Sequence, residues 1–268
     1  MSDCVLSLNS MIYRSIPIFI LWILGLMGTG MSQLRVVDFG TGTSTTDGWA
    51  NINSVNYSGY GGFPGSSAWP APIGSNVIGS GDADLNRVAG SPTGGGPFLS
   101  SSSIYFGNFV QVANALGGTL RVSDSTPLAN LKTIVFQIQI GEVMGYDFYN
   151  PMGAPALQVN GGSTVVTPLY FGVLDRYQTG TFPSPATGND EPVFVNTWGY
   201  QWDVSSFGPI STLSIDFSGV THSQVYALQL DQGSTLFNVA IIPEPGIAWM
   251  LLCGACWSLA RRRSCRVA

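Results

Sequence analysis

The sequence has little charge, lysine or histidine. Charged residues make up 9% of the 268 residues, Lys132 is the only lysine and His222 the only histidine. Between Gln33 and Ile242 there are five basic and thirteen acidic residues, a net charge of −8. Binding to nucleic-acid phosphates requires a basic face. Because the central segment is acidic, we expect no nucleic-acid partner.

Cysteine is absent from the same central segment. The four cysteines, Cys4, Cys253, Cys256 and Cys265, all lie towards the two ends of the sequence. The centre therefore contains neither a disulfide nor a thiolate metal site. Cys253 and Cys256 have the spacing of a metal or redox pair, but they stand in an apolar run without a second pair. A single histidine also excludes a histidine-rich zinc site, so we expect no resident cofactor.

The central segment also lacks helical periodicity and is rich in turn formers, with 34 glycines and 16 prolines in the whole chain. Thr133–Ile140 and Thr212–Phe217 alternate apolar and polar residues instead, which is typical of antiparallel strands with one face in water. We predict an all-β domain over residues 33–240, an antiparallel β-sandwich of jelly-roll-like form. The expected strands are Leu34–Phe39, a short one around Trp49–Tyr57, Ile104–Val112, Gly118–Ser123, Thr133–Ile140, Ala156–Asn160, Thr164–Val166, Leu169–Asp175, Val193–Val204, Thr212–Phe217, Gln224–Leu230 and Thr235–Ala240.

Residues 1–32 have the pattern of a secretory signal peptide. Arg14 supplies the basic region, and Ile16–Met27 is an apolar run of twelve residues followed by small residues. Such a run is long enough for a signal helix but too short to span a bilayer. We expect export of the chain and cleavage after Gly30 or Ser32. An uncleaved N-terminal anchor is the alternative.

The other end, residues 241–268, combines three elements in order. Pro243-Glu244-Pro245 precedes the apolar stretch Gly246–Ala260, and Arg261-Arg262-Arg263 follows it. Fifteen helical residues rise about 22 Å, less than the roughly 30 Å hydrocarbon core. The arginines are expected to stay cytoplasmic. This arrangement indicates a transmembrane-like helix that serves as a temporary anchor, with a plain C-terminal membrane anchor as the alternative.

The three elements together resemble the PEP-CTERM sorting signal. The resemblance implies that Pro243, Glu244 and Pro245 are recognised by an exosortase, a membrane-embedded processing enzyme, and that Arg261–Arg263 stop transfer. It also implies an exported protein of the cell envelope, outer surface or extracellular matrix in a Gram-negative bacterium that makes exopolysaccharide. The resemblance covers about 26 of the 268 residues. It implies nothing about the fold or activity of residues 33–240.

Three aromatic residues, Trp198, Tyr200 and Trp202, alternate with small or polar ones and therefore share one strand face. An exposed face of this kind would stack against sugar rings, whereas a buried one would be core. A free row of large aromatic rings on a secreted surface is unfavourable. We therefore predict that at least two of the three pack in the core, with carbohydrate contact as the alternative.

Other candidate sites carry weaker patterns. Asp82-x-Asp84-x-Asn86 has the spacing of calcium ligands, but Arg87 stands where the EF-hand loop needs glycine, so calcium remains only an alternative. His222 is expected in a solvated turn, and no Gly-x-Ser-x-Gly motif accompanies it. No spacing selects a pair of carboxylates for glycoside hydrolysis. We therefore expect no enzyme.

The sequence favours a structural or adhesive role for the β-sandwich at the cell surface. The first alternative is a carbohydrate-binding module, which would expose the face of Trp198, Tyr200 and Trp202. The second alternative is a secreted hydrolase, which would show paired carboxylates about 5–10 Å apart in a cleft. The expected partners are the exosortase, the membrane before processing, and an exopolysaccharide in the carbohydrate-binding alternative.

Overall fold

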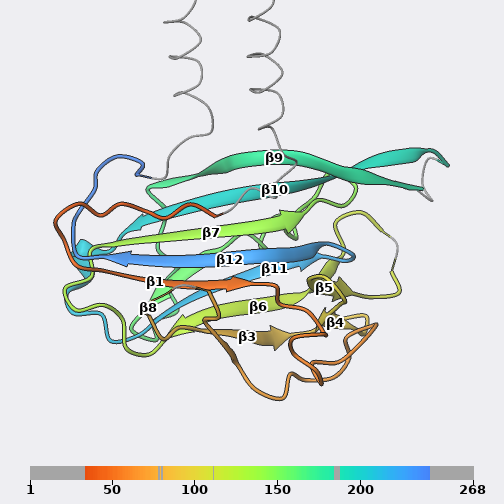
Figure 1. The fold of residues 1–268 in the computed structure, drawn as a ribbon, viewed down its shortest axis with the longest axis horizontal. Coiled ribbons are helices and arrows are strands. Elements are labelled where there is room, and N and C mark those ends of the chain that lie inside the picture. Colours follow the sequence, from red (N-terminus) through yellow and green to blue (C-terminus); the bar gives the residue numbers. More distant parts are fainter. Residues whose placement is uncertain (1–33, 78, 80, 111, 184–187, 242–268) are drawn as a thin grey trace, which may run out of the picture. The chain divides into compact units, whose positions relative to one another are not determined.

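The structure is a computed structural model that describes residues 34–241, except residues 78, 80, 111 and 184–187 (Figure 1). The described part contains twelve strands, one short 3-10 helix, η1 (Ser205–Phe207), and no α-helix. Within these ranges no helix has the length and apolar character needed to cross a membrane. The predicted signal peptide and the predicted sorting signal, including Pro243–Pro245 and Arg261–Arg263, lie outside the described residues.

The larger sheet has seven strands, all paired antiparallel. The strand order is β4-β5-β12-β7-β10-β9. Strand β1 also pairs with β12, along the same edge of β12 as β5. The long hairpin of β9 and β10 forms one end of this sheet (Figure 1). The strands are β1 (Ser44–Ala50), β4 (Gly96–Leu99), β5 (Ile104–Gly107), β7 (Thr133–Gly141), β9 (Tyr170–Pro183), β10 (Asp190–Asp203) and β12 (Gln224–Gly233).

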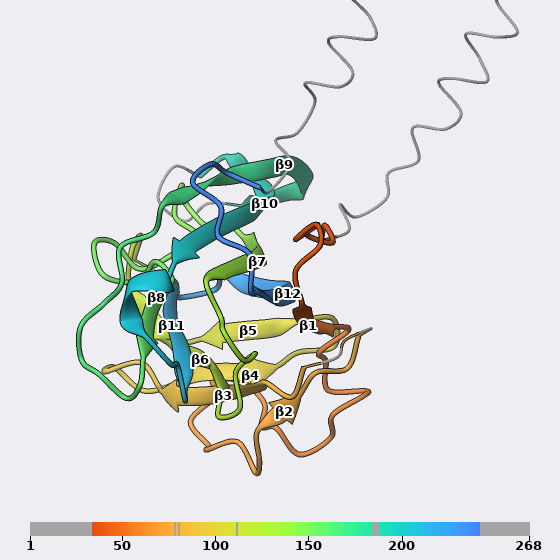
Figure 2. The same cartoon turned by 90° about the vertical axis from the view of Figure 1, so that its left-hand side faces the viewer.

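The smaller sheet has five antiparallel strands in the order β2-β3-β6-β11-β8. Figure 2 shows it as a second layer against the larger sheet. The prediction of an all-β fold built from two antiparallel sheets is confirmed. The strands are β2 (Ile73–Gly74), β3 (Asp84–Ala89), β6 (Leu116–Asp124), β8 (Ala156–Val159) and β11 (Leu213–Val220).

The core lies between the two sheets because alternate residues of facing strands point inward. In β11 the residues at Leu213, Ile215 and Phe217 are buried, while the side chains between them are partly exposed. In β7 Ile134, Phe136, Ile138 and Ile140 join the same core, as predicted from their alternation. Burial of these apolar side chains is the main favourable contribution to folding.

The expectation that the glutamine face of β7 meets water is wrong, because every residue of β7 is buried. Two segments predicted as strands, Leu34–Phe39 and Thr235–Ala240, are not strands and instead lie against this face. The Gln137 side chain exchanges two hydrogen bonds with the backbone of Arg35, at 3.0 and 2.6 Å. Gln201 likewise accepts from Ile241 N at 2.8 Å and donates to Val239 O at 2.9 Å. Side-chain amides of the sheet thus bind the backbone of these two segments, which form no backbone ladder with the sheet.

These two segments also close a second, smaller apolar cluster on the outer face of the larger sheet. Val37 and Phe39 pack there with Val135 and Leu174, and Phe237 joins them.

A third predicted strand, Thr164–Val166, is not formed, and only a single bridge joins Leu157 and Val166. The short strand expected around Trp49–Tyr57 is instead β1, which ends at Ala50, and the glycine-rich stretch after it contains β2, β3 and β4, whose positions the sequence pattern did not predict.

Candidate functional site

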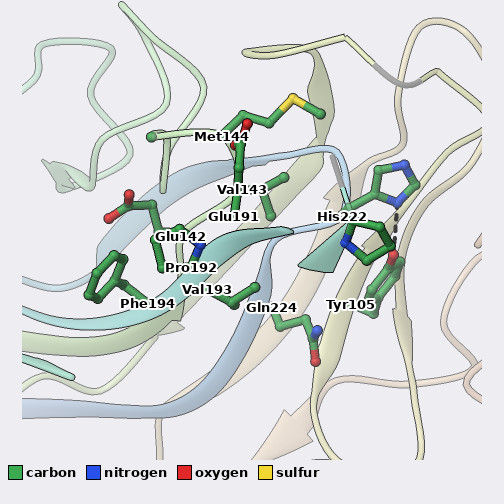
Figure 3. Close-up of a pocket in the computed structure, with 12 residues that line it drawn as sticks. Tyr105, Glu142, Val143, Met144, Glu191, Pro192, Val193, Phe194, His222 and Gln224 are labelled. Carbon is green, nitrogen blue, oxygen red and sulfur yellow. Dashed lines mark hydrogen bonds between the residues drawn. The ribbon is translucent and has the colours of Figure 1, made fainter. Parts of the chain in front are cut away.

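A pocket of about 520 Å³ opens at the end of the sandwich where β7 ends and β10 and β12 begin (Figure 3). This volume is in the range of small-molecule sites. Its apolar wall comes from Val143, Met144, Pro192 and Val193, and polar side chains line it from β5, β10, β12 and the loops that follow β7 and β11. The lining residues are Tyr105, Glu142, Val143, Met144, Gly145, Pro183, Glu191, Pro192, Val193, Phe194, His222 and Gln224.

His222 lies in the turn between β11 and β12, as predicted, but its ring is not a freely solvated one. Its Nδ1 is 2.7 Å from the hydroxyl of Tyr105, and both residues line the pocket (Figure 3). Burial lowers the pKa of His222 and raises the pKa of Tyr105. Both groups are therefore neutral near pH 7, and a hydrogen bond joins the phenol oxygen to Nδ1, which leaves Nε2 on the other side of the ring. The backbone at His222 has a φ of 73°, an unusual value for a residue with a side chain.

Two carboxylates, Glu142 and Asp147, meet beside the pocket around the amide of Asn196. Asn196 Nδ2 is 3.1 Å from Glu142 Oε2 and 2.9 Å from Asp147 Oδ2, and Trp198 Nε1 donates to Asp147 Oδ2 at 2.7 Å. Burial is the main cause that raises the pKa of Asp147, and the bonds from Trp198 and Asn196 oppose it. No sequence pattern pointed to this pair, because the residues that join the two acids come from β10, about fifty positions away.

Arg176 connects this carboxylate pair to the pocket. Its guanidinium lies 2.9 Å from Glu142 Oε2 and 3.9 Å from the centre of the Phe194 ring. Glu142 and Phe194 both line the pocket. Protein donors therefore engage both carboxylates of the pair, an arrangement that anchors the loop after β7 to β10. It differs from an open acid pair across a cleft, which glycoside hydrolysis uses.

The aromatic row of β10 faces the core, which confirms the prediction that at least two of its rings are buried. Trp202 is 0% and Tyr200 3% exposed, whereas Trp198 is partly buried at the margin of the core. The three rings stack in sequence with interplanar angles of 26° and 16°. The row therefore does not form an open three-ring platform. Phe171 of β9 extends it outward, stacked on Tyr200 at 12° and 63% exposed.

The three residues with calcium-ligand spacing do not form a loop. Asp84 and Asn86 lie on β3, and Asp82 precedes the strand. All three line a hollow of about 530 Å³ on the smaller sheet. In the described part of the chain no three His, Cys, Asp or Glu side chains are assembled as a group that could hold a metal ion. Asp84–Ala89 is a strand, and extended backbone does not wrap an ion as an EF-hand loop does.

Comparisons with known proteins give no relative. The chain matches no family model, no curated protein and no solved structure.

Proposed function

We propose that this chain is an exported protein of the cell envelope or extracellular matrix, sorted through a PEP-CTERM signal, in which the β-sandwich has a structural or adhesive role. The proposal includes an N-terminal signal helix, a transmembrane-like C-terminal sorting helix and a jelly-roll-like sandwich. It assigns no enzymatic activity to the chain. An exosortase is the processing partner.

One observation carries the proposal: the order of Pro243-Glu244-Pro245, the apolar run Gly246–Ala260 and Arg261–Arg263. Each element alone is common, but their order specifies a short membrane helix with a recognition motif outside and a basic stop inside. The burial of Tyr200 and Trp202 supports the structural role over the sugar-platform alternative. The engagement of Glu142 and Asp147 by protein donors supports a role without hydrolysis.

Intact-mass measurement of the protein isolated from the surface of its own producing cells tests the sorting proposal. The mature protein is expected to lack Met1–Gly30 and Gly246–Ala268. A chain with alanine at Pro243, Glu244 and Pro245 is expected to keep the arginine cluster. A native mass that still includes Arg261–Arg263 would overturn the proposal in favour of a permanent anchor.

The chain itself offers a matched control for the recognition motif. Glu191-Pro192 repeats two of the three motif residues, but it lies inside strand β10. The variant Glu191→Ala is expected to be processed like the native chain. A processing defect in this variant would mean that folding of the sandwich, rather than the motif, controls the mass of the mature protein.

Carbohydrate binding is a second candidate, and the pocket at His222 favours it. Glu191, Gln224, Tyr105 and the imidazole of His222 offer polar groups for hydroxyl groups, next to the apolar wall of Val143 and Met144. Two pocket carboxylates, Glu142 and Glu191, disfavour an anionic ligand. The chemistry fits a neutral sugar residue.

Affinity electrophoresis in gels that contain a neutral polysaccharide tests this second candidate. Retention of the full chain is expected to be lost in Met144→Asp, which puts a charge into the apolar wall. It is expected to persist in the control Asp203→Asn, on β10 away from the pocket. Equal retention of both variants, or none for the native chain, would remove the pocket as a sugar site.

A further inference from the structure

Three aspartates meet at one rim of the sandwich, away from the pocket at His222. Asp47 of β1 and Asp124 of β6 lie on the inward faces of their strands and are 0% and 3% exposed. Asp82, in the loop before β3, is exposed. The carboxylates of Asp124 and Asp82 act on Asp47 as neighbouring negative charges, and Asp82 likewise raises the pKa of Asp124.

One oxygen of this cluster has no partner. Asp47 Oδ1 accepts a hydrogen bond from Ala83 N at 3.2 Å, but Asp47 Oδ2 is buried and has no hydrogen-bond partner in the described structure. The loop before β3 closes tightly around it, because a Cβ added to Gly81 would lie 2.0 Å from Oδ2. A buried carboxylate oxygen without a donor is costly, since its hydration is lost and nothing replaces it.

Asp124 and Asp82 have donors, but these donors are neutral. Gln232 Nε2 donates to Asp124 Oδ2 at 2.6 Å, Thr126 N donates to Asp124 Oδ1 at 2.7 Å, and the Thr126 hydroxyl donates to Asp82. The two ion pairs among the described residues involve Asp216 and Glu142 and leave this cluster without a cation. Burial, with added repulsion from the neighbouring carboxylates, raises the pKa of Asp47 to about 6. Near pH 7 the cluster still carries negative charge, and neither ion pair of the described residues involves it.

Two of the three aspartates border a hollow of the surface. Asp82 and Asp124 line the hollow of about 530 Å³ on the smaller sheet, together with Asp84, Arg87 and Arg121, the last of which is paired with Asp216. Asp47 is not among the residues that line this hollow. The cluster therefore combines one buried, unpartnered oxygen with two carboxylates that border the hollow.

We propose that Asp47, Asp82 and Asp124 form a calcium site, with Asp47 Oδ2 as its innermost ligand. Calcium accepts six to eight oxygen ligands in irregular geometry and keeps waters where protein ligands are few, whereas magnesium needs a near-octahedral shell. The three carboxylates are not gathered around one point in the described structure. Binding therefore requires the exposed Asp82 side chain to turn towards Asp47. This site is independent of the proposed function.

Calcium titration of the purified full chain, first treated with chelator, tests the proposal at pH 7.5. The melting temperature is expected to rise by roughly 5 °C or more when calcium reaches about 100 times its Kd. Magnesium is expected to give a much smaller shift. Isothermal titration calorimetry with calcium alone is expected to show one site per chain. Asp190→Asn, which removes an exposed acid of β10, serves as the matched control and is expected to bind calcium like the native chain.

Asp47→Asn is the decisive variant because it keeps the shape of the side chain and removes the charge. It is expected to fold, and its melting temperature is expected to be indifferent to calcium. The competing explanation is that a proton, not a cation, neutralises Asp47. In that case the native chain would show no heat of calcium binding and no change of melting temperature with calcium at pH 7.5, which would overturn the proposal. Equal calcium binding by Asp47→Asn and the native chain would also overturn it.

Discussion

Buried carboxyl groups make the stability of this protein depend on pH. Asp47 and Asp231 are both 0% exposed, and burial is the main cause that raises the pKa of each to about 6 from 3.8. Asp231 accepts hydrogen bonds from Thr46 Oγ1 and Gln229 Nε2, which oppose this rise. Between about pH 4 and 6 the folded state therefore binds more protons than the unfolded state. The free energy of unfolding falls as the pH rises through this window.

Without divalent cations, the full chain is expected to be more stable at pH 4.5 than at pH 7.5, through Asp47 and Asp231. Asp47→Asn is expected to flatten this dependence by about 1–3 kcal/mol, since one pKa unit corresponds to about 1.4 kcal/mol. Urea unfolding of both chains in the presence of chelator at the two pH values measures the effect. The difference between the two chains isolates Asp47 from other titrating groups such as His222. An identical pH dependence would contradict the assigned cause.

The aromatic row of β10 provides a second prediction for single residues. Trp202 is fully buried and donates from Nε1 to Val166 O at 3.0 Å, whereas Phe171 is 63% exposed. Trp202→Ala is expected to destabilise the protein by about 3–5 kcal/mol, because it empties a core site. Phe171→Ala is expected to cost about 1 kcal/mol or less. Equilibrium unfolding in urea compares them, and similar costs would mean that the row is not core.

For single elements, close packing of the strands depends on side-chain size at particular positions. In β11 a Cβ on Gly219 would lie 2.4 Å from the Phe106 ring of β5, because the two sheets approach closely there. In β9 a Cβ on Gly180 would meet no atom within 4 Å. The two glycines therefore have different roles, although neither has a backbone conformation that demands glycine.

Gly219→Ala is expected to destabilise the sandwich by about 1–3 kcal/mol through overpacking against Phe106. Gly180→Ala, the matched control in the hairpin, is expected to be neutral or slightly stabilising, because alanine lowers the entropy of the unfolded chain. Thermal unfolding of the two full-length variants separates the effects. A neutral Gly219→Ala would show that the sheets can move apart at this point without cost.

At the scale of the whole molecule, the sandwich holds together without any covalent cross-link. The four cysteines, Cys4, Cys253, Cys256 and Cys265, all lie outside the described residues. Stability of the described part therefore comes from burial and hydrogen bonds, including the side-chain amides of Gln137 and Gln201 that attach the end segments.

The melting temperature of the full chain is expected to be the same with and without dithiothreitol, because no disulfide constrains the unfolded state of the sandwich. Differential scanning calorimetry of the oxidised and reduced chain measures it. A chain with serine at all four cysteine positions serves as the control and is expected to melt at the same temperature. A shift of several degrees on reduction would show that the ends contribute a cross-link to stability.

Local patterns in the sequence were sufficient to predict the all-β class, the inward faces of β7 and β11 and the absence of a disulfide from the sandwich, because period-two alternation and residue counts are local properties. They also located most of the strands from β5 onward. They could not predict β2–β4, whose short pairings lie among glycines and have little periodicity. The prediction of strands at Leu34–Phe39 and Thr235–Ala240 was wrong for the opposite reason. The apolar residues of these segments pack against the larger sheet, but their backbones form no hydrogen-bond ladder with it.

Which polar residues meet became visible only in the folded chain. Gln137 lies beside Arg35, Glu142 and Asp147 meet at Asn196, and Asp47 reaches the loop at Ala83, across separations of 36 to 102 residues. The same holds for Tyr105 and His222, 117 residues apart, at the pocket. In an antiparallel sandwich, neighbours are set by strand order and register rather than by spacing along the chain. For this reason spacing alone suggested calcium ligands along β3, whereas the fold places the unbalanced charge around Asp47.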